Sequence, residues 1–373
     1  MTRVEIAVAP RPYRAIIENG TLERAGALLR PILDEAAQLF VISVLPVRKW
    51  SRKLLSSLKQ AGFSAQLIEM PDGERHKKLA TVETLSEKLA AAGADRSSVI
   101  VALGGGLVGD VAGLTAALYM RGIDVVQIPT TVLAQVDASI GGKTGVNLRA
   151  GKNLVGAFHQ PRVVLIDPDV LASLPDRQFR AGLFESLKCG VIGKPELFIR
   201  MESTSVRDLR NDPEALQWII AESVKLKAGV VAADEREHGL RRILNFGHTI
   251  GHALEAETAY RYFLHGEAVA WGMMAATHIA AANGSLDSLA EGRITAAIAR
   301  LGPLPGVQVN PRRILRRLQS DKKTLQGAVH FVLPREIGKV DIVNNVPDEL
   351  ILNSLERLRR LSEKGKSHLR SGA

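Results

Sequence analysis

The chain has 373 residues, 46% of them hydrophobic, so it is long enough to bury a large core and to divide into two domains. Its single cysteine, Cys189, excludes an internal disulfide framework. The longest weakly polar run, residues 268–282, is shorter than the roughly 20 residues that cross a bilayer. The 49 basic and 39 acidic residues give a charge of +10, which suits nucleic acid, anionic lipid or a small anionic substrate without choosing among them.

Two further features concern the cellular compartment and the distribution of the basic residues. The first six residues lack the basic-then-apolar layout of a signal peptide, which together with the single cysteine favours a reducing cytoplasm. Much of the basic excess lies in two stretches that we interpret as solvated helix faces and a frayed tail. These residues are Arg312, Arg313, Arg316, Arg317, Arg357, Arg359, Arg360, Lys364, Lys366 and Arg370.

In chain order, the first half shows short strand-like runs separated by helical stretches such as residues 79–92. The expected strands are residues 4–8, 39–44, 98–103, 124–128 and 162–166. This alternation predicts an α/β domain with a parallel sheet. Prolines at 161, 168 and 175 then interrupt the chain, and they place a domain boundary near residue 170.

The second half has apolar residues at helical spacing. The expected helices are residues 215–231, 248–258, 268–282 and 289–301, and a strand pair is expected at residues 328–333 and 339–343. We therefore expect an α/β domain over residues 1–170 and a mainly α-helical domain over residues 171–373.

A glycine motif follows the expected strand at residues 98–103. Gly104, Gly106 and Gly109 have G-x-G-x-x-G spacing, and a helix-compatible stretch starts near Asp110. Bare backbone at such a turn lets a pyrophosphate approach the first amides of the helix, and the alternative is a tight structural turn. Asp124 stands where a ribose-binding acid could lie, and we interpret that spacing as coincidence.

Glycine, hydroxyl, amide and lysine groups concentrate over residues 129–137, 141–147 and 151–153. Lysine supplies a point charge and glycine and threonine supply close donors, so these segments are suited to facing a phosphate. Two ordinary turns are the alternative. The spacing of a Walker loop is absent.

Three histidines form a candidate metal site. His248 and His252 are four residues apart, so they share a helix face, and His265 follows further along the chain. A zinc-type ion takes about three nitrogen or carboxylate ligands, and the nearest acids are Glu267 and Glu185, between which spacing does not choose. Thr249 stands where a zincin protease has glutamate, which argues against that chemistry.

Several long motifs in order resemble the 3-dehydroquinate synthase family over roughly residues 70–335. They are residues 104–110, Met120-Arg121-Gly122, residues 129–147, 151–154, 185–188 and 245–252, and residues 264–267. The resemblance implies a Rossmann-like dinucleotide-binding N-terminal domain and a mainly helical metal- and substrate-binding C-terminal domain, with the active site in the cleft between them. It also implies a cytoplasmic homodimer that binds neither nucleic acid nor membrane.

The resemblance implies a lyase of the shikimate route to aromatic amino acids. It would convert 3-deoxy-D-arabino-heptulosonate 7-phosphate to 3-dehydroquinate and phosphate by transient oxidation, phosphate elimination, reduction, ring opening and aldol closure. NAD would be used and regenerated in each turnover, with one divalent ion, Zn²⁺ or Co²⁺. The alternatives are another sugar-phosphate cyclase acting on a heptulose 7-phosphate, a metal-dependent alcohol dehydrogenase, and, from charge alone, a nucleic-acid-binding protein.

The family motifs also assign roles to individual residues. The implied metal ligands are Glu185, His248 and His265, and the implied catalytic residues are His252, Lys143, Asp137 and Lys188. The implied substrate-binding residues are Arg121, which would reach the neighbouring subunit's substrate, and Lys152, Asn153, Lys227, Arg241 and Asn245. The implied cofactor-binding residues are Asp72, Glu74, Lys77, Gly104, Gly105, Gly106, Asp110, Thr130, Thr131, Lys143 and Lys152. Lys322 or Lys323 would add a phosphate contact.

Three positions depart from the family pattern. Ser43-Val44-Leu45-Pro46 replaces a segment that commonly carries an aspartate after the second strand, which removes the expected partner of the adenosine ribose. Cys189 replaces a tyrosine, and Phe184 stands where a small residue is common. We interpret both as packing changes.

Overall fold

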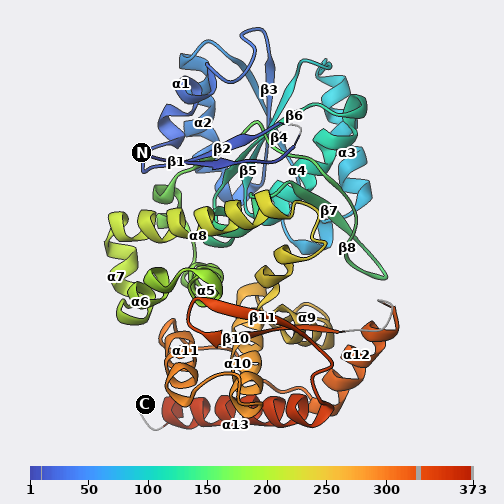
Figure 1. Ribbon diagram of the computed structural model, residues 1–373. Helices are drawn as coiled ribbons and strands as arrows, with labels where there is room; N and C mark the ends of the chain where they lie inside the picture. Colours follow the sequence, from blue (N-terminus) through green and yellow to red (C-terminus); the bar gives the residue numbers. More distant parts are fainter. Residues whose placement is uncertain (10, 325–328, 371–373) are drawn as a thin grey trace. The chain divides into compact units, whose positions relative to one another are not determined.

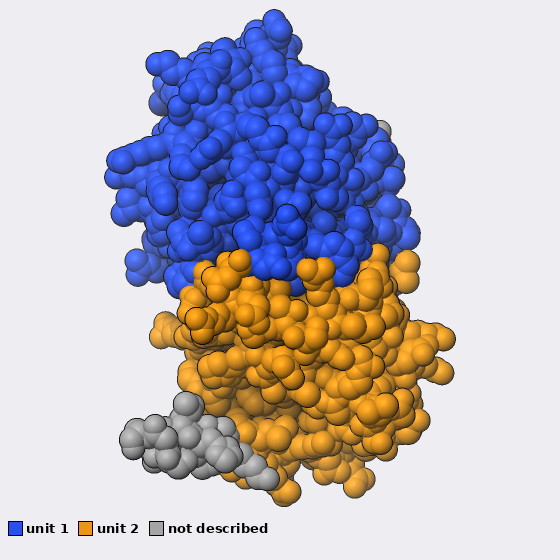
Figure 2. Space-filling view, turned by 90° about the vertical axis from the view of Figure 1, so that its left-hand side faces the viewer, with its two compact units in different colours: residues 1–175, 212–235 blue, residues 176–211, 236–373 orange. Residues whose placement is uncertain are grey.

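The structure is a computed structural model that describes residues 1–9, 11–324 and 329–370, with the backbone alone described at 320–324 and 364–370. The chain forms two compact units, coloured separately in Figure 2. Unit 1 comprises Met1–Pro175 and Asp212–Glu235, and unit 2 comprises Asp176–Asn211 and Arg236–Ala373. A single boundary near residue 170 therefore does not describe the units, because the chain returns to unit 1 after residue 211.

Unit 1 is built on a seven-stranded sheet in the order β1-β2-β9-β6-β5-β3-β4 (Figure 1). The strands are β1 (Thr2–Ile6), β2 (Tyr13–Ile17), β3 (Gln38–Ser43), β4 (Ser64–Glu69), β5 (Val99–Gly104), β6 (Asp124–Pro129) and β9 (Val163–Ile166). Neighbouring strands are parallel except at the edge, where β1 pairs antiparallel with β2. Every residue of β5 and β9 is buried, as expected for inner strands of a parallel sheet covered on both faces.

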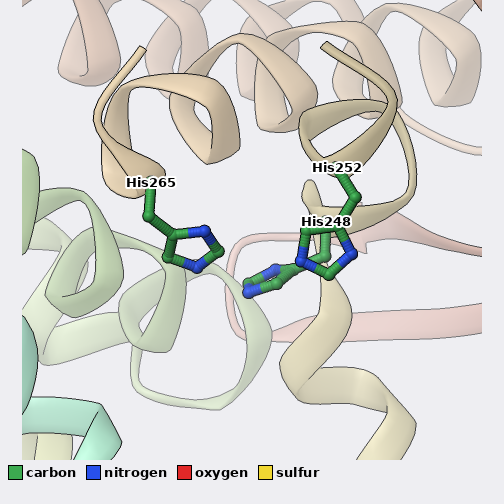
Figure 3. Close-up of side chains that lie close together, drawn as sticks. All are labelled: His248, His252 and His265. Carbon is green, nitrogen blue, oxygen red and sulfur yellow. The ribbon is translucent and has the colours of Figure 1, made fainter. Parts of the chain in front are cut away.

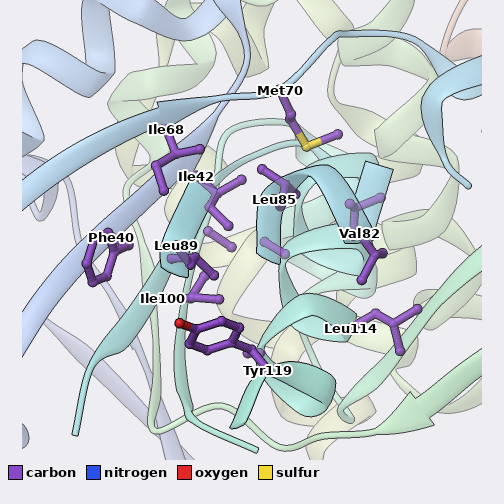
Figure 4. Close-up of a cluster of buried hydrophobic side chains, with 14 of the residues drawn as sticks. Phe40, Ile42, Ile68, Met70, Val82, Leu85, Leu89, Ile100, Leu114 and Tyr119 are labelled. Carbon is purple, nitrogen blue, oxygen red and sulfur yellow. The ribbon is translucent and has the colours of Figure 1, made fainter. Parts of the chain in front are cut away.

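The helices of unit 1 are α1 (Ala25–Leu29), α2 (Arg48–Gln60), α3 (Leu79–Ala91), α4 (Gly106–Leu118) and α8 (Pro213–Ala233). Side chains of β3, β4 and β5 form one apolar core with those of α3 and α4 (Figure 4). Ile42, Ile100 and Leu89 are almost completely buried in it. This core fixes the start of α4 at the carboxyl end of β5, where the glycine motif lies.

Two further elements complete unit 1. β7 (Lys143–Leu148) and β8 (Gly151–Phe158) form an antiparallel hairpin, where the sequence had indicated loops facing an anion. α8 packs against β1 and against the short π-helical turn Ala134–Ala138, so it belongs to unit 1 although its neighbours in sequence belong to unit 2.

Unit 2 is mainly helical. Its helices are α5 (Asp176–Gly193), α6 (Pro195–Ser203), α7 (Val206–Asn211), α9 (His248–Glu257), α10 (His265–Ala282), α11 (Ser288–Arg300), α12 (Pro311–Thr324) and α13 (Asp348–Arg370). The one described strand pair of this unit is β10 (His330–Glu336) with β11 (Lys339–Asn344). α10 is buried along nearly its whole length and contacts α5, α9, α11 and α13, which makes it the central helix of the unit.

The predicted fold class is confirmed, with a largely parallel α/β sheet followed by a mainly helical region. The expected strand pair near residues 330–344 is also present, although the predicted start at Ala328 lies outside the described residues. Within the described part of the chain, no helix combines the length and apolarity needed to span a membrane.

Candidate functional site

The three histidines of unit 2 lie together (Figure 3). His248 begins α9, His252 lies one turn later on the same helix, and His265 begins α10. One donor atom from each ring can be chosen so that all three atoms lie within 4.8 Å of one another. The i, i+4 spacing therefore places His248 and His252 on the same face of α9, as the sequence predicted.

Close helix packing brings these rings together. Gly247 precedes α9 with φ +82°, and a Cβ at this position would lie 2.7 Å from the carbonyl oxygen of Val269 in α10. Gly266, next to His265, lies against the backbone of Ala181 in α5 so closely that any Cβ would overlap it. Glycine at both positions lets α5, α9 and α10 meet at backbone contact.

Glu185 reaches the histidines from α5. Its Oε1 atom lies 3.8 Å from Nε2 of His248 and 3.7 Å from Nε2 of His265. The carboxylate is buried, and its Oε2 forms an ion pair with the buried Lys188, whereas Oε1 has no hydrogen-bond partner among the described residues. A buried carboxylate without hydrogen bonds is costly unless a cation meets it.

The outer nitrogens of two rings already have acceptors. Nδ1 of His248 lies 3.2 Å from the carbonyl oxygen of Phe246, and Nδ1 of His265 lies 3.2 Å from Oε2 of Glu255. Because a carbonyl and a carboxylate only accept, each Nδ1 donates, and in the neutral ring this leaves the lone pair on Nε2. Both lone pairs belong to the nitrogens that face Glu185.

This donor set suits a divalent ion. Ligands about 2.0–2.1 Å from a tetrahedral ion lie about 3.3–3.4 Å apart, slightly less than the separations of Glu185 from the two imidazoles. His252 is more exposed than the other two, and its ring centroid lies 5.3 Å from that of His248 and 5.8 Å from that of His265. Geometry alone leaves His252 as a further candidate ligand.

Other predicted residues of unit 2 lie on neighbouring segments. Lys188 is on α5, one turn after Glu185, and Arg241 is buried in the short helix Leu240–Asn245 that precedes α9. Asn245 ends that helix, and its side-chain amide donates to Oε1 of Glu237 at 2.8 Å. Lys322 and Lys323 lie in the segment whose side chains are not described.

In unit 1, the glycine motif forms the turn from β5 into α4. Gly105 is the N-cap of α4, where no side chain caps the first amides. A Cβ at Gly105 would lie 3.1 Å from the Thr131 methyl carbon, so glycine keeps this turn open to a ligand. Thr130 beside it has a buried hydroxyl oxygen with no hydrogen-bond partner among the described residues. A pyrophosphate at this turn would meet free amides and a free hydroxyl.

Lys77 connects several predicted cofactor residues. The buried ammonium group forms an ion pair with Asp110 on α4 and donates to Oδ1 of Asn153 at 2.6 Å. Burial raises the pKa of the Asp110 carboxyl, and the charge of Lys77 opposes that rise. Asn147 accepts a hydrogen bond from the Asn153 amide and donates to Glu74, so one network ties α4, β7, β8 and the segment around Glu74.

The remaining predicted residues of unit 1 lie at four places in the fold. Lys227 on α8 is buried and donates to Oδ1 of Asp137 at 2.5 Å. Lys143 and Lys152 lie on the hairpin of β7 and β8. Arg121 is exposed after α4, and its φ of 69° marks a tight end to that helix. Asp72 lies in the segment before α3, where it accepts a hydrogen bond from the Gly73 amide.

Several positions discussed from the sequence have structural roles. Asp124 lies at the opposite end of β6 from the glycine turn and pairs with Arg11 and Arg162. Ser43 is buried and donates to the carbonyl oxygen of Leu103, which excludes it as a ribose partner in this conformation. Phe184 and Cys189 are buried in α5, consistent with packing.

Sequence reasoning missed one acid, Glu255, and left Glu267 open as a candidate ligand. Glu255 is buried and holds His265, and its spacing of seven residues from His248 puts it on the same face of α9, which was the available signal. Glu267 caps α10 by accepting from the Leu264 amide and from the guanidinium group of Arg177 on α5. It therefore acts as a helix cap and not as a member of the histidine cluster.

Comparisons with known proteins agree with these observations. Residues 67–181 match the family model described as 3-dehydroquinate synthase N-terminal, and residues 182–324 match 3-dehydroquinate synthase C-terminal. The 3-dehydroquinate synthase of Koribacter versatilis is 55% identical over 366 residues, covering 98% of this chain and 100% of that protein.

Two solved structures share the fold at moderate identity. The 2-epi-5-epi-valiolone synthase of Streptomyces hygroscopicus, with NAD⁺ and Zn²⁺ bound, is 31% identical with a TM-score of 0.86 over 95% of this chain and 98% of that one. A 2-deoxy-scyllo-inosose synthase complexed with carbaglucose-6-phosphate, NAD⁺ and Co²⁺ is 30% identical with a TM-score of 0.83 over 95% and 99%.

Proposed function

The chain belongs to the 3-dehydroquinate synthase family, and on that premise we propose that it converts 3-deoxy-D-arabino-heptulosonate 7-phosphate to 3-dehydroquinate and phosphate. The observation that carries the proposal is the buried Oε1 atom of Glu185, which faces Nε2 of both His248 and His265 and has no hydrogen-bond partner among the described residues. Such a set is suited to one divalent ion, and solved relatives contain Zn²⁺ or Co²⁺.

We assign Glu185, His248 and His265 as the ligands of that ion. When bound, the ion favours loss of the proton from the substrate hydroxyl that is oxidised. The hydrogen bonds from Nδ1 of the two histidines orient their rings and direct the lone pair of the neutral ring to Nε2. His252, the more exposed ring, is assigned to the substrate phosphate.

NAD is the second proposed cofactor. The supporting observations are the uncapped start of α4 at Gly105, the unpartnered hydroxyl of Thr130 and the network around Lys77. NAD, held by these residues, would supply reversible hydride transfer for the transient oxidation of the secondary alcohol. The assigned residues are Asp72, Glu74, Lys77, Gly104, Gly105, Gly106, Asp110, Thr130, Thr131, Lys143 and Lys152.

The substrate carries a phosphate and a carboxylate, and the arginine and lysine residues of the assigned set supply matching positive charge, while the others supply hydrogen-bonding groups. These residues are Arg121, Asp137, Lys143, Lys152, Asn153, Lys188, Lys227, Arg241, Asn245 and His252. Asp137 holds Lys227, and Glu237 holds the Asn245 amide, so both groups are oriented before substrate arrives. Such positioning is suited to a reaction that relies on orienting one substrate through several steps.

We also propose a cytoplasmic homodimer in which Arg121 reaches the substrate of the neighbouring subunit. Exposed apolar side chains lie near it in sequence, at Leu118 and Met120, and others lie on or beside β7 and β8 at Leu148, Leu154 and Phe158. Exposed apolar surface of this kind supports an interface with a second copy. Cys189 is a buried free thiol, in keeping with a reducing compartment.

One assay tests the proposed reaction. The purified protein is supplied with the heptulosonate phosphate, NAD and Zn²⁺ or Co²⁺, and phosphate, NADH and the carbocyclic product are followed together. We expect equal amounts of phosphate and dehydroquinate with no net NADH. Steady accumulation of NADH would instead identify a dehydrogenase, and turnover of only a heptulose 7-phosphate that lacks the carboxylate would identify another sugar-phosphate cyclase.

A further inference from the structure

Unit 2 contains a cavity that uses none of the residues assigned above. Its volume is about 570 Å³, within the range of pockets that hold small organic molecules. The walls come from α10, α11, α13 and the segment 302–306, and they are mainly apolar, with Trp271, Met274 and Leu304 among them. Trp271 is fixed because its indole nitrogen donates to the carbonyl oxygen of Pro305 at 2.9 Å.

One buried polar ring lines this cavity. His278 on α10 is only 4% exposed, and its Nδ1 lies 2.8 Å from Oε1 of Glu291 on α11. The same carboxylate oxygen lies 2.7 Å from Nη1 of Arg357 on α13. Glu291 is thus held by one cation and accepts a hydrogen bond from the imidazole, which fixes the ring in one orientation.

The other ring nitrogen of His278 is unpaired within the described part of the chain. Nε2 of His278 is buried and has no hydrogen-bond partner among the described residues. Burial, and secondly the charge of Arg357, lower the pKa of His278 below its ordinary value, so the ring is neutral near pH 7. Since Nδ1 carries the proton, Nε2 is an acceptor that lacks a donor.

We propose that this cavity binds a small aromatic molecule with one O–H or N–H donor, its ring against Trp271 and Met274 and its donor on Nε2 of His278. The apolar walls select an aromatic or aliphatic body, and the single buried acceptor selects a donor on it. A phenol or an indole has this chemistry. The site lies apart from the proposed reaction, because none of its lining residues is an assigned ligand or substrate contact.

The test compares three probes of nearly equal shape on the full-length protein. Calorimetry or ligand-observed NMR would measure the binding of p-cresol, toluene and 4-methylanisole, which offer a donor, no polar group and an acceptor respectively. We expect p-cresol to bind at least about fivefold more tightly than toluene or 4-methylanisole, the value of one net hydrogen bond. No saturable binding of p-cresol at millimolar concentration, or equal affinity for all three probes, would overturn the proposal.

Variants separate the cavity from general effects on folding. Ala296 on α11 lines the cavity and is exposed, so Ala296→Phe should fill it without disturbing the core and should abolish binding of p-cresol and toluene alike. Leu289→Phe, on an exposed part of the same helix away from the cavity, should leave binding unchanged. His278→Leu should retain toluene and lose the preference for p-cresol. Undiminished binding by Ala296→Phe would place the ligand elsewhere and refute the site.

Discussion

The regions around Asp110 in unit 1 and Glu185 in unit 2 place an acid beside a buried lysine in different ways. Asp110 pairs with Lys77, and that lysine is also held by Asn153, so the charges are met within the protein. Glu185 pairs with Lys188 on one side, but its other oxygen faces two imidazole lone pairs. Three electron-rich atoms that face one another are suited to binding a cation.

This difference indicates which of the two sites, the Lys77 network or the Glu185 cluster, depends on an added ion. The Lys77 network is complete without a ligand, so chelation of metal should leave it intact. In the Glu185 cluster, Oε1 of the carboxylate and the two imidazole nitrogens already face one another, so metal should bind there directly. Each of the following measurements tests this difference between the two regions.

The largest expected effect is on the Glu185 cluster. Glu185→Gln should lower metal affinity by more than about a hundredfold, because it removes a charged ligand and not merely an outer partner. Turnover should fall with metal content, measured by atomic absorption after dialysis. His252→Ala is the matched control and should retain the metal, so loss of metal from that variant would make His252 a ligand instead.

A second change acts on unit 1. Lys77→Met leaves the partly buried Asp110 beside an apolar chain, and we expect a loss of about 3 kcal/mol in the free energy of unfolding. Urea denaturation would measure this loss, and NAD affinity should fall while bound metal stays constant. The double variant Lys77→Met, Asp110→Asn should recover part of the stability, and an equally unstable double variant would contradict the pairing.

A smaller effect is expected from the acid behind His265. Glu255→Gln keeps the shape but weakens the acceptor for Nδ1, and we expect metal affinity to fall by about 10-fold to 100-fold. Competition with a chromophoric chelator would measure it. If Glu255→Gln and Glu255→Ala both bind metal as the parent does, then Glu255 only fills space.

The smallest effect concerns a buried ring away from both regions. The pKa of His278 is lowered from 6.5 by burial, so the unfolded chain binds this proton more readily than the folded one. The stability that its neutral form gives is present above pH 6.5 and is lost as pH falls through the lowered pKa. Urea titrations should show a slope of at most about 1.4 kcal/mol per pH unit from this group. His278→Gln should flatten the profile, and an unchanged profile would assign the slope elsewhere.

Much of the fold could be predicted because its signals are local. The buried strands β3, β5 and β9 are continuous apolar runs, and β5 is followed at once by the glycine turn. β4 was missed since only one of its residues, Ile68, is fully buried. The return of α8 to unit 1 was also missed, because helical periodicity reveals a buried face and not the partner that covers it.

The candidate site could be predicted only in part, because residue spacing reveals neighbours within one helix and not contacts between helices. His248 and His252 share a helix turn, so their proximity follows from spacing. Glu185 lies on a different helix far upstream, and residue spacing could not choose between it and Glu267 as the metal ligand. The structure identifies Glu267 as the cap of α10. Only the family resemblance distinguished these acids before the fold was known.

The glycine contacts between α9 and α10 have a thermodynamic consequence. Gly272 in α10 lies so close to the backbone of Gly247 that a side chain on either would push the two helices apart. His248 and His265 are therefore held at their separation by the backbone itself. Binding of an ion to such a preformed site orders little additional chain, so its heat-capacity change should be small, in contrast to small zinc domains that fold only around their metal.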